Sequence, residues 1–193
     1  MINQNAFLQN IIQTLNKTGI PYMISGSFAS SFHGYPRATN DADIVIAPTE
    51  KQLKDFIECL GENYYVSLDA ALDALKKNFM FNVIDTQSGW KADFIIRKER
   101  AYSKTEFQRR QNTRIKQLDV CMVSPEDAIL TKLEWTKQSG SEQQFRDATG
   151  IAVVQWEYLD KEYLYKWANE LQITSSLEVL LHQAKAITNK SNK

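Results

Sequence analysis

The sequence predicts an α/β (α+β) fold, in which helices flank a mixed sheet and an all-helical part follows at the C-terminal end. Before residue 124, short apolar runs typical of buried strands alternate with segments whose apolar residues have helical spacing. From Ser124 onward, only helical spacing remains. We therefore expect one α/β domain over residues 1–123 and a helical region over residues 124–193 that packs against it.

The composition is that of a globular protein. Of the 193 residues, 43% are hydrophobic and 24% are charged, which leaves enough apolar surface for a core. The 23 basic and 23 acidic residues cancel, so the overall charge does not imply a nucleic-acid partner. No apolar run approaches the roughly 18 residues that a membrane-spanning helix needs, and we expect no association with a membrane.

Two cysteines and the first residues bear on the compartment. Cys59 and Cys121 each lie among apolar residues, so we expect two buried, unpaired thiols, which suit a reducing compartment. The N-terminal segment lacks the basic region of a signal peptide. Together these features predict a cytoplasmic protein.

The first elements follow from apolar spacing and from residues that break helices. The apolar residues of the segment 7–15 have helical spacing, and Gly19 and Pro21 end that helix. Gly34 and Pro36 end the next helical segment. We expect a strand over residues 22–25, a helix over 28–33 and a strand over 42–47.

Capping residues mark the following helices. Thr49 and Gln52 have the spacing of a capping box, and Ser67 precedes a second helical pattern. Gly89 lies in a polar turn between two apolar runs, which predicts a pair of strands. Strands are expected over residues 79–85, 91–96 and 118–123.

The C-terminal part reads as helix after helix. Ser124 is the expected N-cap of the first, with Pro125 at the first helical position. Further helices are expected over residues 142–154, 161–171 and 176–187.

One stretch, Arg97–Lys116, is strongly basic, with eight basic and two acidic residues. Such a patch suits an RNA backbone, because phosphate contacts supply most sequence-independent affinity. Few aromatic residues interleave with the charges, so a solvated helix-loop surface is the competing interpretation.

Two carboxylates stand at the start of an apolar strand. Asp41 and Asp43 are separated by one residue, so their side chains lie on the same face, about 7 Å apart along the strand. Such a pair is costly unless water or a cation compensates it, and Mg²⁺ prefers one or two carboxylates together with substrate phosphates. The alternatives are a metal site and a solvated strand start.

A third carboxylate, Asp93, also precedes an apolar strand. If the two strands are neighbours, Asp93 can converge with Asp41 and Asp43 at one end of the sheet. That arrangement suits a two-metal phosphoryl-transfer site. Earlier in the chain, Gly26 and Ser27 lie between a strand and a helix, where backbone N–H groups and a hydroxyl favour an anion.

This order of elements resembles the nucleotidyltransferase superfamily related to DNA polymerase beta. The pattern of that superfamily is a strand, G-S, a helix, D-x-D on the next strand, and a later single Asp. The matching residues here are Gly26, Ser27, Asp41, Asp43 and Asp93.

The string SGSFASSFHGYPRATNDADIVI is similar to one branch of that superfamily, the AbiE-type abortive-infection toxins and related bacterial proteins. That branch carries a lysine in a P-E-D-x-x-x-x-K helix and a downstream R-D, matched here by Lys132 and Asp147. The likeness covers most of residues 20–150.

The resemblance implies a role for each matching residue. Asp41, Asp43 and Asp93 would hold two Mg²⁺ or Mn²⁺ ions, and Asp93 would help to deprotonate the acceptor hydroxyl. A nucleoside triphosphate such as ATP would be bound by phosphate contacts from Gly26, Ser27, Arg37 and Lys132.

These residues also have plainer alternatives. Asp93 alone could be an acid that flanks a turn, and Gly26 and Ser27 could be an ordinary helix N-cap. Lys132 could be an exposed helix lysine, and Arg37 could be a loop arginine in water. Asp147 could orient Lys132, or it could pair with Arg146 or another surface charge.

The resemblance also implies a reaction, the transfer of a nucleoside monophosphate to an acceptor hydroxyl with release of pyrophosphate. The acceptor could be RNA such as a tRNA end, a protein side chain, or a small molecule such as an antibiotic, and an antitoxin protein could be a partner. A nucleotide- or partner-binding module of the same fold without catalysis is the alternative.

Overall fold

The computed structural model describes residues 4–39 and 41–191, which form two compact units. The sheet unit comprises residues 4–25 and Thr39–Met122, and the helical unit comprises Gly26–Ala38 and residues 123–191. The segment Gly26–Ala38 thus groups with the C-terminal helices, although it precedes most of the sheet in the sequence.

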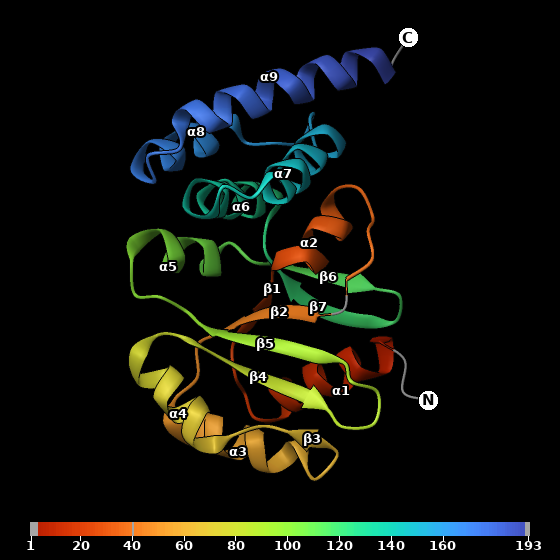
Figure 1. Ribbon diagram of the computed structural model, residues 1–193, viewed down its shortest axis with the longest axis vertical. Coiled ribbons are helices and arrows are strands. Elements are labelled where there is room, and N and C mark those ends of the chain that lie inside the picture. The colour runs from red at the N-terminus through yellow and green to blue at the C-terminus, as the bar shows by residue number, and fades with distance from the viewer. Residues whose placement is uncertain (1–3, 40, 192–193) are drawn as a thin grey trace. The chain divides into compact units, whose positions relative to one another are not determined.

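Seven strands of the sheet unit form one mixed sheet among the described residues (Figure 1). Their spatial order is β3-β4-β5-β2-β1-β7-β6. The pairs β2–β5 and β1–β7 are parallel, and the other pairs are antiparallel. The strands are β1 (Tyr22–Ile24), β2 (Asp41–Ile46), β3 (Tyr64–Tyr65), β4 (Met80–Asp85), β5 (Lys91–Ile96), β6 (Gln111–Ile115) and β7 (Leu118–Met122).

The two faces of β2 differ in burial. Ala42, Ile44 and Ile46 are buried, whereas Asp41 and Asp43 alternate with them and are partly exposed. This is the alternation that a strand covered on one face shows.

Aromatic side chains show which elements cover the buried face. Phe94 lies opposite Ile44 in the register of β2 and β5. Its ring lies 5.2 Å from that of Phe56 in the helix α3, which covers this face, and 5.2 Å from that of Phe81 on the neighbouring strand β4. The helices of the sheet unit are α1 (Gln4–Lys17), α3 (Glu50–Leu60), α4 (Leu68–Lys77) and α5 (Ala101–Gln108).

The predicted fold class is confirmed, and most predicted elements are present within one or two residues. The Thr49–Gln52 capping box is formed, and Ser67 caps α4 as predicted. The stretch Arg97–Lys116, for which a solvated helix-loop surface is the competing interpretation, also contains the strand β6. Because β6 is a polar edge strand, its sequence QNTRI has no apolar alternation, and its pairing with β7 decides its conformation.

The prediction that both cysteines are buried is wrong. Cys59 is exposed and Cys121 is half-buried, and both are free. Cys59 lies in α3 between the buried residues Phe56 and Leu60, but its position on the helix turns it outward. Apolar neighbours in sequence do not imply burial in a helix, because only one side of the helix faces the core.

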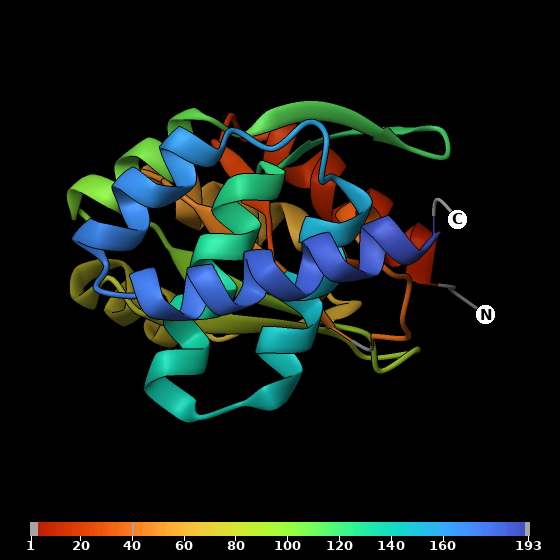
Figure 2. The same ribbon diagram turned by 90° about the horizontal axis from the view of Figure 1, so that it is seen from above.

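The helical unit contains α2 (Gly26–His33), α6 (Pro125–Ser139), α7 (Glu142–Val154), α8 (Lys161–Glu170) and α9 (Thr174–Ser191). Gly140, in the left-handed conformation, ends α6, and Ser141 precedes α7, so the two helices form a tight hairpin (Figure 2). α2 packs against α6 and α7, and α9 packs against α7 and α8. No helix in the described part of the chain is both long and apolar enough to cross a membrane.

Gly34 allows the close approach of the end of α2 to α7. A Cβ atom at this position would lie 2.8 Å from the backbone N of Ile151 and 2.9 Å from the backbone C of Gly150. We expect Gly34→Ala to lower the free energy of unfolding by about 1–3 kcal/mol, as overpacking typically does, and a melting curve measures this.

Gly150→Ala is the matched comparison. The nearest atom to a Cβ at Gly150 is a side-chain carbon of Tyr35, 3.0 Å away, and a side chain can move where backbone cannot. Its loss of stability should be smaller, and a Gly34→Ala variant that melts at the wild-type temperature would contradict the backbone argument.

Candidate functional site

The three predicted acids lie on one face of two adjacent parallel strands. Asp43 on β2 is directly opposite Asp93 on β5, and Asp41 precedes Asp43 by two residues on the same face. The prediction that β2 and β5 are neighbours in one mixed sheet is thus confirmed. We call Asp41, Asp43 and Asp93 the carboxylate cluster.

A lysine that the sequence interpretation missed lies at this cluster. Lys91 is opposite Asp41 in the register, and its Nζ atom lies 3.0 Å from Oδ2 of Asp93 and 3.9 Å from Oδ2 of Asp41. The hydrogen bond to Asp93 is the main cause that raises the pKa of Lys91 above its ordinary value, and the charges of Asp41 and Asp43 add to it. The ammonium group is therefore a cation held by the cluster.

Other polar contacts fix two of the carboxylates. Asn82 on β4 donates from Nδ2 to Oδ1 of Asp93 at 2.5 Å, and Thr39 donates from its hydroxyl to Oδ1 of Asp41 at 3.0 Å. The side chain of Asp93 is 11% exposed, and that of Asp41 is 40% exposed. Asp93 is thus the enclosed member of the cluster, and Asp41 is the open one.

Among the described residues, no three His, Cys, Asp or Glu side chains are grouped closely enough to hold a metal ion together. Within the carboxylate cluster, Asp93 accepts hydrogen bonds at both of its oxygens, from Asn82 at Oδ1 and from Lys91 at Oδ2. The alternation of the sequence KAD on a strand already puts Lys91 and Asp93 on one face, so this lysine could have been found from the sequence. Asn82 could not, because its contact depends on the register of β4 with β5.

The Gly26–Ser27 pair opens α2, as the motif requires. Gly26 has a φ of +59°, in the left-handed region that favours glycine, and it follows β1 after a single residue. Its carbonyl accepts a hydrogen bond from the Ser30 hydroxyl at 2.8 Å. This conformation gives a physical reason for glycine at position 26.

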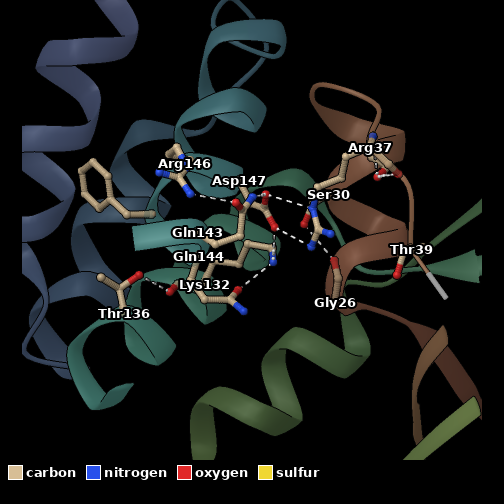
Figure 3. Close-up of polar contacts among 12 residues, drawn as sticks. Gly26, Ser30, Arg37, Thr39, Lys132, Thr136, Gln143, Gln144, Arg146 and Asp147 are labelled. Atoms are coloured by element: carbon tan, nitrogen blue, oxygen red, sulfur yellow. Dashed lines mark hydrogen bonds and ion pairs between the residues drawn. The ribbon is translucent and has the colours of Figure 1, made fainter. Parts of the chain in front are cut away.

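Lys132 is buried, so its interpretation as an exposed helix lysine is wrong. Its side chain on α6 is 5% exposed, and Ile129 and Leu133 beside it are fully buried. Nζ donates to Oδ2 of Asp147 at 2.9 Å and to Oε1 of Gln144 at 2.7 Å (Figure 3). A buried ammonium needs such partners, because an uncompensated charge is costly away from water.

Asp147 on α7 holds two cations. Arg37 donates from Nε and Nη2 to the two carboxylate oxygens of Asp147, each at 3.2 Å, as Figure 3 shows. Asp147 therefore contacts Lys132 and also pairs with another charged residue, Arg37, so both kinds of contact left open for it are present. Arg146 instead forms an ion pair with Glu142.

The pKa of Asp147 reflects this surrounding. Burial alone would raise it, but the hydrogen bond and charge of Lys132, with hydrogen bonds from Arg37 and Gln143, outweigh burial and hold the pKa below its ordinary value of 3.8. Asp147 is therefore ionised at neutral pH, and it keeps Lys132 and Arg37 on one side of α7. We call Arg37, Lys132 and Asp147, with Gln143 and Gln144, the cation group.

The basic stretch does not present all its charges freely. Arg97 and Lys104 both form ion pairs with Glu99, and Arg114 pairs with Asp119. Arg110 lies over the ring of Phe107. Local acids thus offset part of the positive charge that the sequence count suggests.

Comparison with known proteins identifies the fold. No known family's sequence pattern and no curated protein sequence matches the chain. The structure is similar to the nucleotidyltransferase-like antigenic protein from Paracoccidioides brasiliensis, with a TM-score of 0.63 and 15% identity over 95% of this chain and 89% of that one.

Two structures of the antibiotic-resistance factor ANT(2'')-Ia are also similar. Its solution structure has a TM-score of 0.54 and 14% identity, over 98% of this chain and 95% of that one. Its crystal structure with adenylyl-2''-tobramycin has a TM-score of 0.55 and 15% identity, over 95% of this chain and 97% of that one. The chain thus has the fold of nucleotidyltransferases.

Proposed function

We propose that the protein is a metal-dependent nucleotidyltransferase, which moves a nucleoside monophosphate from a nucleoside triphosphate to an acceptor hydroxyl. The observation that carries the proposal is the register of β2 and β5, which sets Asp43 opposite Asp93 with Asp41 on the same face. Carboxylates on one face of two adjacent strands are the type of ligand that the metal ions of phosphoryl transfer use. The fold supports the same reaction class.

The donor set fits Mg²⁺ or Mn²⁺. Carboxylate oxygens are the ligands that these hard ions prefer, and the cluster already holds one cation, the ammonium group of Lys91. Mg²⁺ is usually bound by one or two carboxylates together with substrate phosphates, so it does not need three closely grouped acids. Asp41, Asp43 and Asp93 would hold the metal together with phosphate oxygens of the triphosphate. When bound, the metal would supply positive charge to the phosphates and lower the energy of the charged transition state.

Other residues would bind the triphosphate and move the proton. Lys132 and Arg37 would contact phosphate oxygens, and the backbone at Gly26 and Ser27 would do so at the start of α2. Asp93 would accept the proton of the acceptor hydroxyl. The acceptor oxygen forms a bond to the α-phosphorus, the bond from that phosphorus to the bridging oxygen breaks, and pyrophosphate leaves.

The cation group supports the phosphate-binding role. Arg37 and Lys132 carry two positive charges against the single negative charge of Asp147, so the group has a net charge of +1 among its side chains. Catalysis of this kind consists largely of positioning and charge neutralisation, for which a preorganised lysine and arginine are suited.

The acceptor and the partners are proposed in finer terms. The resemblance to the AbiE-type branch favours RNA such as a tRNA end as acceptor and an antitoxin as protein partner. The likeness to ANT(2'')-Ia, solved with adenylyl-2''-tobramycin, favours an aminoglycoside hydroxyl as a second candidate acceptor.

The test separates transfer from binding. Calorimetry with ATP, GTP, CTP and UTP, each with and without Mg²⁺, should give triphosphate binding that depends on the metal. Incubation of the protein with α-labelled triphosphates and Mg²⁺ should then move label to tRNA, to an aminoglycoside or to the protein itself, with release of pyrophosphate. Metal-independent binding with no transfer to any of these acceptors would favour a non-catalytic binding module.

A further inference from the structure

We infer that Lys91 is an internal counter-ion of the carboxylate cluster, which competes with divalent cations for Asp93 and sets the metal affinity of the protein. The inference rests on the proposed metal site and adds a device that controls it. In the metal-free protein the ammonium group stabilises the cluster, and a metal ion that binds must displace it.

The contacts of Asp93 are the first support. Oδ1 accepts a hydrogen bond from Asn82, and Oδ2 accepts one from Lys91 at 3.0 Å. Both carboxylate oxygens are therefore engaged by groups of the chain itself. Asn82 leaves lone pairs on Oδ1, but the positive charge of Lys91 at Oδ2 repels any second cation there.

The position of Lys91 is fixed by the sheet. Because Lys91 lies opposite Asp41 and two residues before Asp93, strand geometry alone directs its side chain to the face of the three acids. Its Nζ atom lies 3.9 Å from Oδ2 of Asp41, so the ammonium group lies between acids from two strands. A shift of β5 against β2 would be needed to take this lysine away from the cluster's face.

The side chain can nevertheless leave. The side chain of Lys91 is 36% exposed, whereas that of Lys132, which Asp147 and Gln144 hold, is 5% exposed. A partly exposed lysine on a flexible stem can turn its ammonium group into water at small cost. Lys91 is thus a displaceable cation, and Lys132 is a fixed one.

Charge counting gives the consequence. The three carboxylates carry −3 together, and the ammonium group of Lys91 reduces this to −2. An approaching divalent cation thus meets a smaller negative charge and must also displace the ammonium group. Without Lys91 the cluster would bind a divalent cation more tightly, because the cation would meet a larger negative charge and would displace nothing.

The experiment measures binding of Mg²⁺ or Mn²⁺ alone to the full chain by calorimetry. In Lys91→Met, which keeps the length of the side chain and removes the charge, we expect the Kd to fall about ten-fold, the size of a partly exposed charge interaction. Lys91→Arg keeps the charge and should bind the metal no more tightly than wild type. Lys77→Met is the matched control, since Lys77 pairs with Asp73 on a helix, at 2.8 Å, in the same unit.

Melting curves give a second readout. Without metal, Lys91→Met should melt at a lower temperature than wild type, because Asp93 and Asp41 then lose the ammonium group that lies beside them. With saturating Mg²⁺ the difference should disappear or reverse. Lys77→Met should show no such dependence on metal.

The possible results are distinct. Equal or weaker metal binding in Lys91→Met, while wild type binds metal and Asp43→Asn weakens that binding, overturns the role of Lys91 and leaves the proposed function standing. Absence of metal binding in both wild type and Lys91→Met overturns the metal dependence of the proposed function together with this inference.

Discussion

Asp43→Asn should reduce nucleotide transfer by about a thousand-fold or more while leaving the fold intact. The substitution keeps the size of the side chain and its place on β2, but it removes one negative charge from the carboxylate cluster. If that charge holds the cation that stabilises the transferring phosphoryl group, its loss costs several kcal/mol of transition-state stabilisation, at about 1.4 kcal/mol for each factor of ten. The assay is transfer from labelled triphosphate with Mg²⁺.

The stability of the Asp43→Asn variant decides between a functional and a structural role. In the absence of metal, we expect it to melt at or slightly above the wild-type temperature, because removal of one of three neighbouring like charges relieves repulsion. Asp73→Asn, an exposed helix carboxylate of the same unit, is the control and should keep full activity. A clearly destabilised Asp43→Asn with unchanged metal affinity and transfer would refute the nucleotidyltransferase proposal.

Lys132→Met should reduce transfer by about a hundred-fold. A charge-assisted hydrogen bond from lysine to phosphate contributes about 1.5–3 kcal/mol, and methionine fills the same buried space without a charge. The free energy of unfolding should fall by about 1–2 kcal/mol. This loss is smaller than the one expected when a buried carboxylate is left with no cation at all, because Asp147 keeps its two contacts with Arg37.

Two comparisons isolate the phosphate role of Lys132. Lys137→Met, at an exposed position of the same helix, should change neither transfer nor stability appreciably. Transfer activity per folded molecule, measured below the melting temperature, separates the structural role from the phosphate role. If Lys132 is purely structural, Lys132→Met will be less stable than wild type but will keep full transfer activity at 20 °C.

The pH dependence of stability should report the same ion pairs. The pKa of Asp147 is lower in the folded protein than its ordinary value, so its ion pairs stabilise the fold fully above that value. This contribution is lost as pH falls from about 4 through the depressed pKa. In Lys132→Met the loss on acidification should be smaller than in wild type, which acid titrations followed by circular dichroism can measure.

The sequence by itself determined the local structure well, because local rules govern it. Apolar spacing located α1 and α7, the Thr49–Gln52 capping box located the start of α3, and Gly89 located the turn between β4 and β5. The carboxylate cluster was also predictable in outline, because alternation along β2 and the similar start of β5 suggest acids on neighbouring strands. These signals depend on residues that are close in the sequence.

Only the tertiary structure decided the contacts that give the candidate residues their surroundings. Burial of Lys132 and its pairing with Asp147 depend on the packing of α6 against α7, and exposure of Cys59 depends on which side of α3 faces the core. Likewise, the polar sequence of β6 becomes a strand only because β7 provides hydrogen-bonding partners. Such properties arise from pairing and packing between segments, so they cannot be deduced from the side-chain type alone. A lysine that is buried without a partner destabilises the fold, whereas the same lysine stabilises it when it forms an ion pair with a carboxylate.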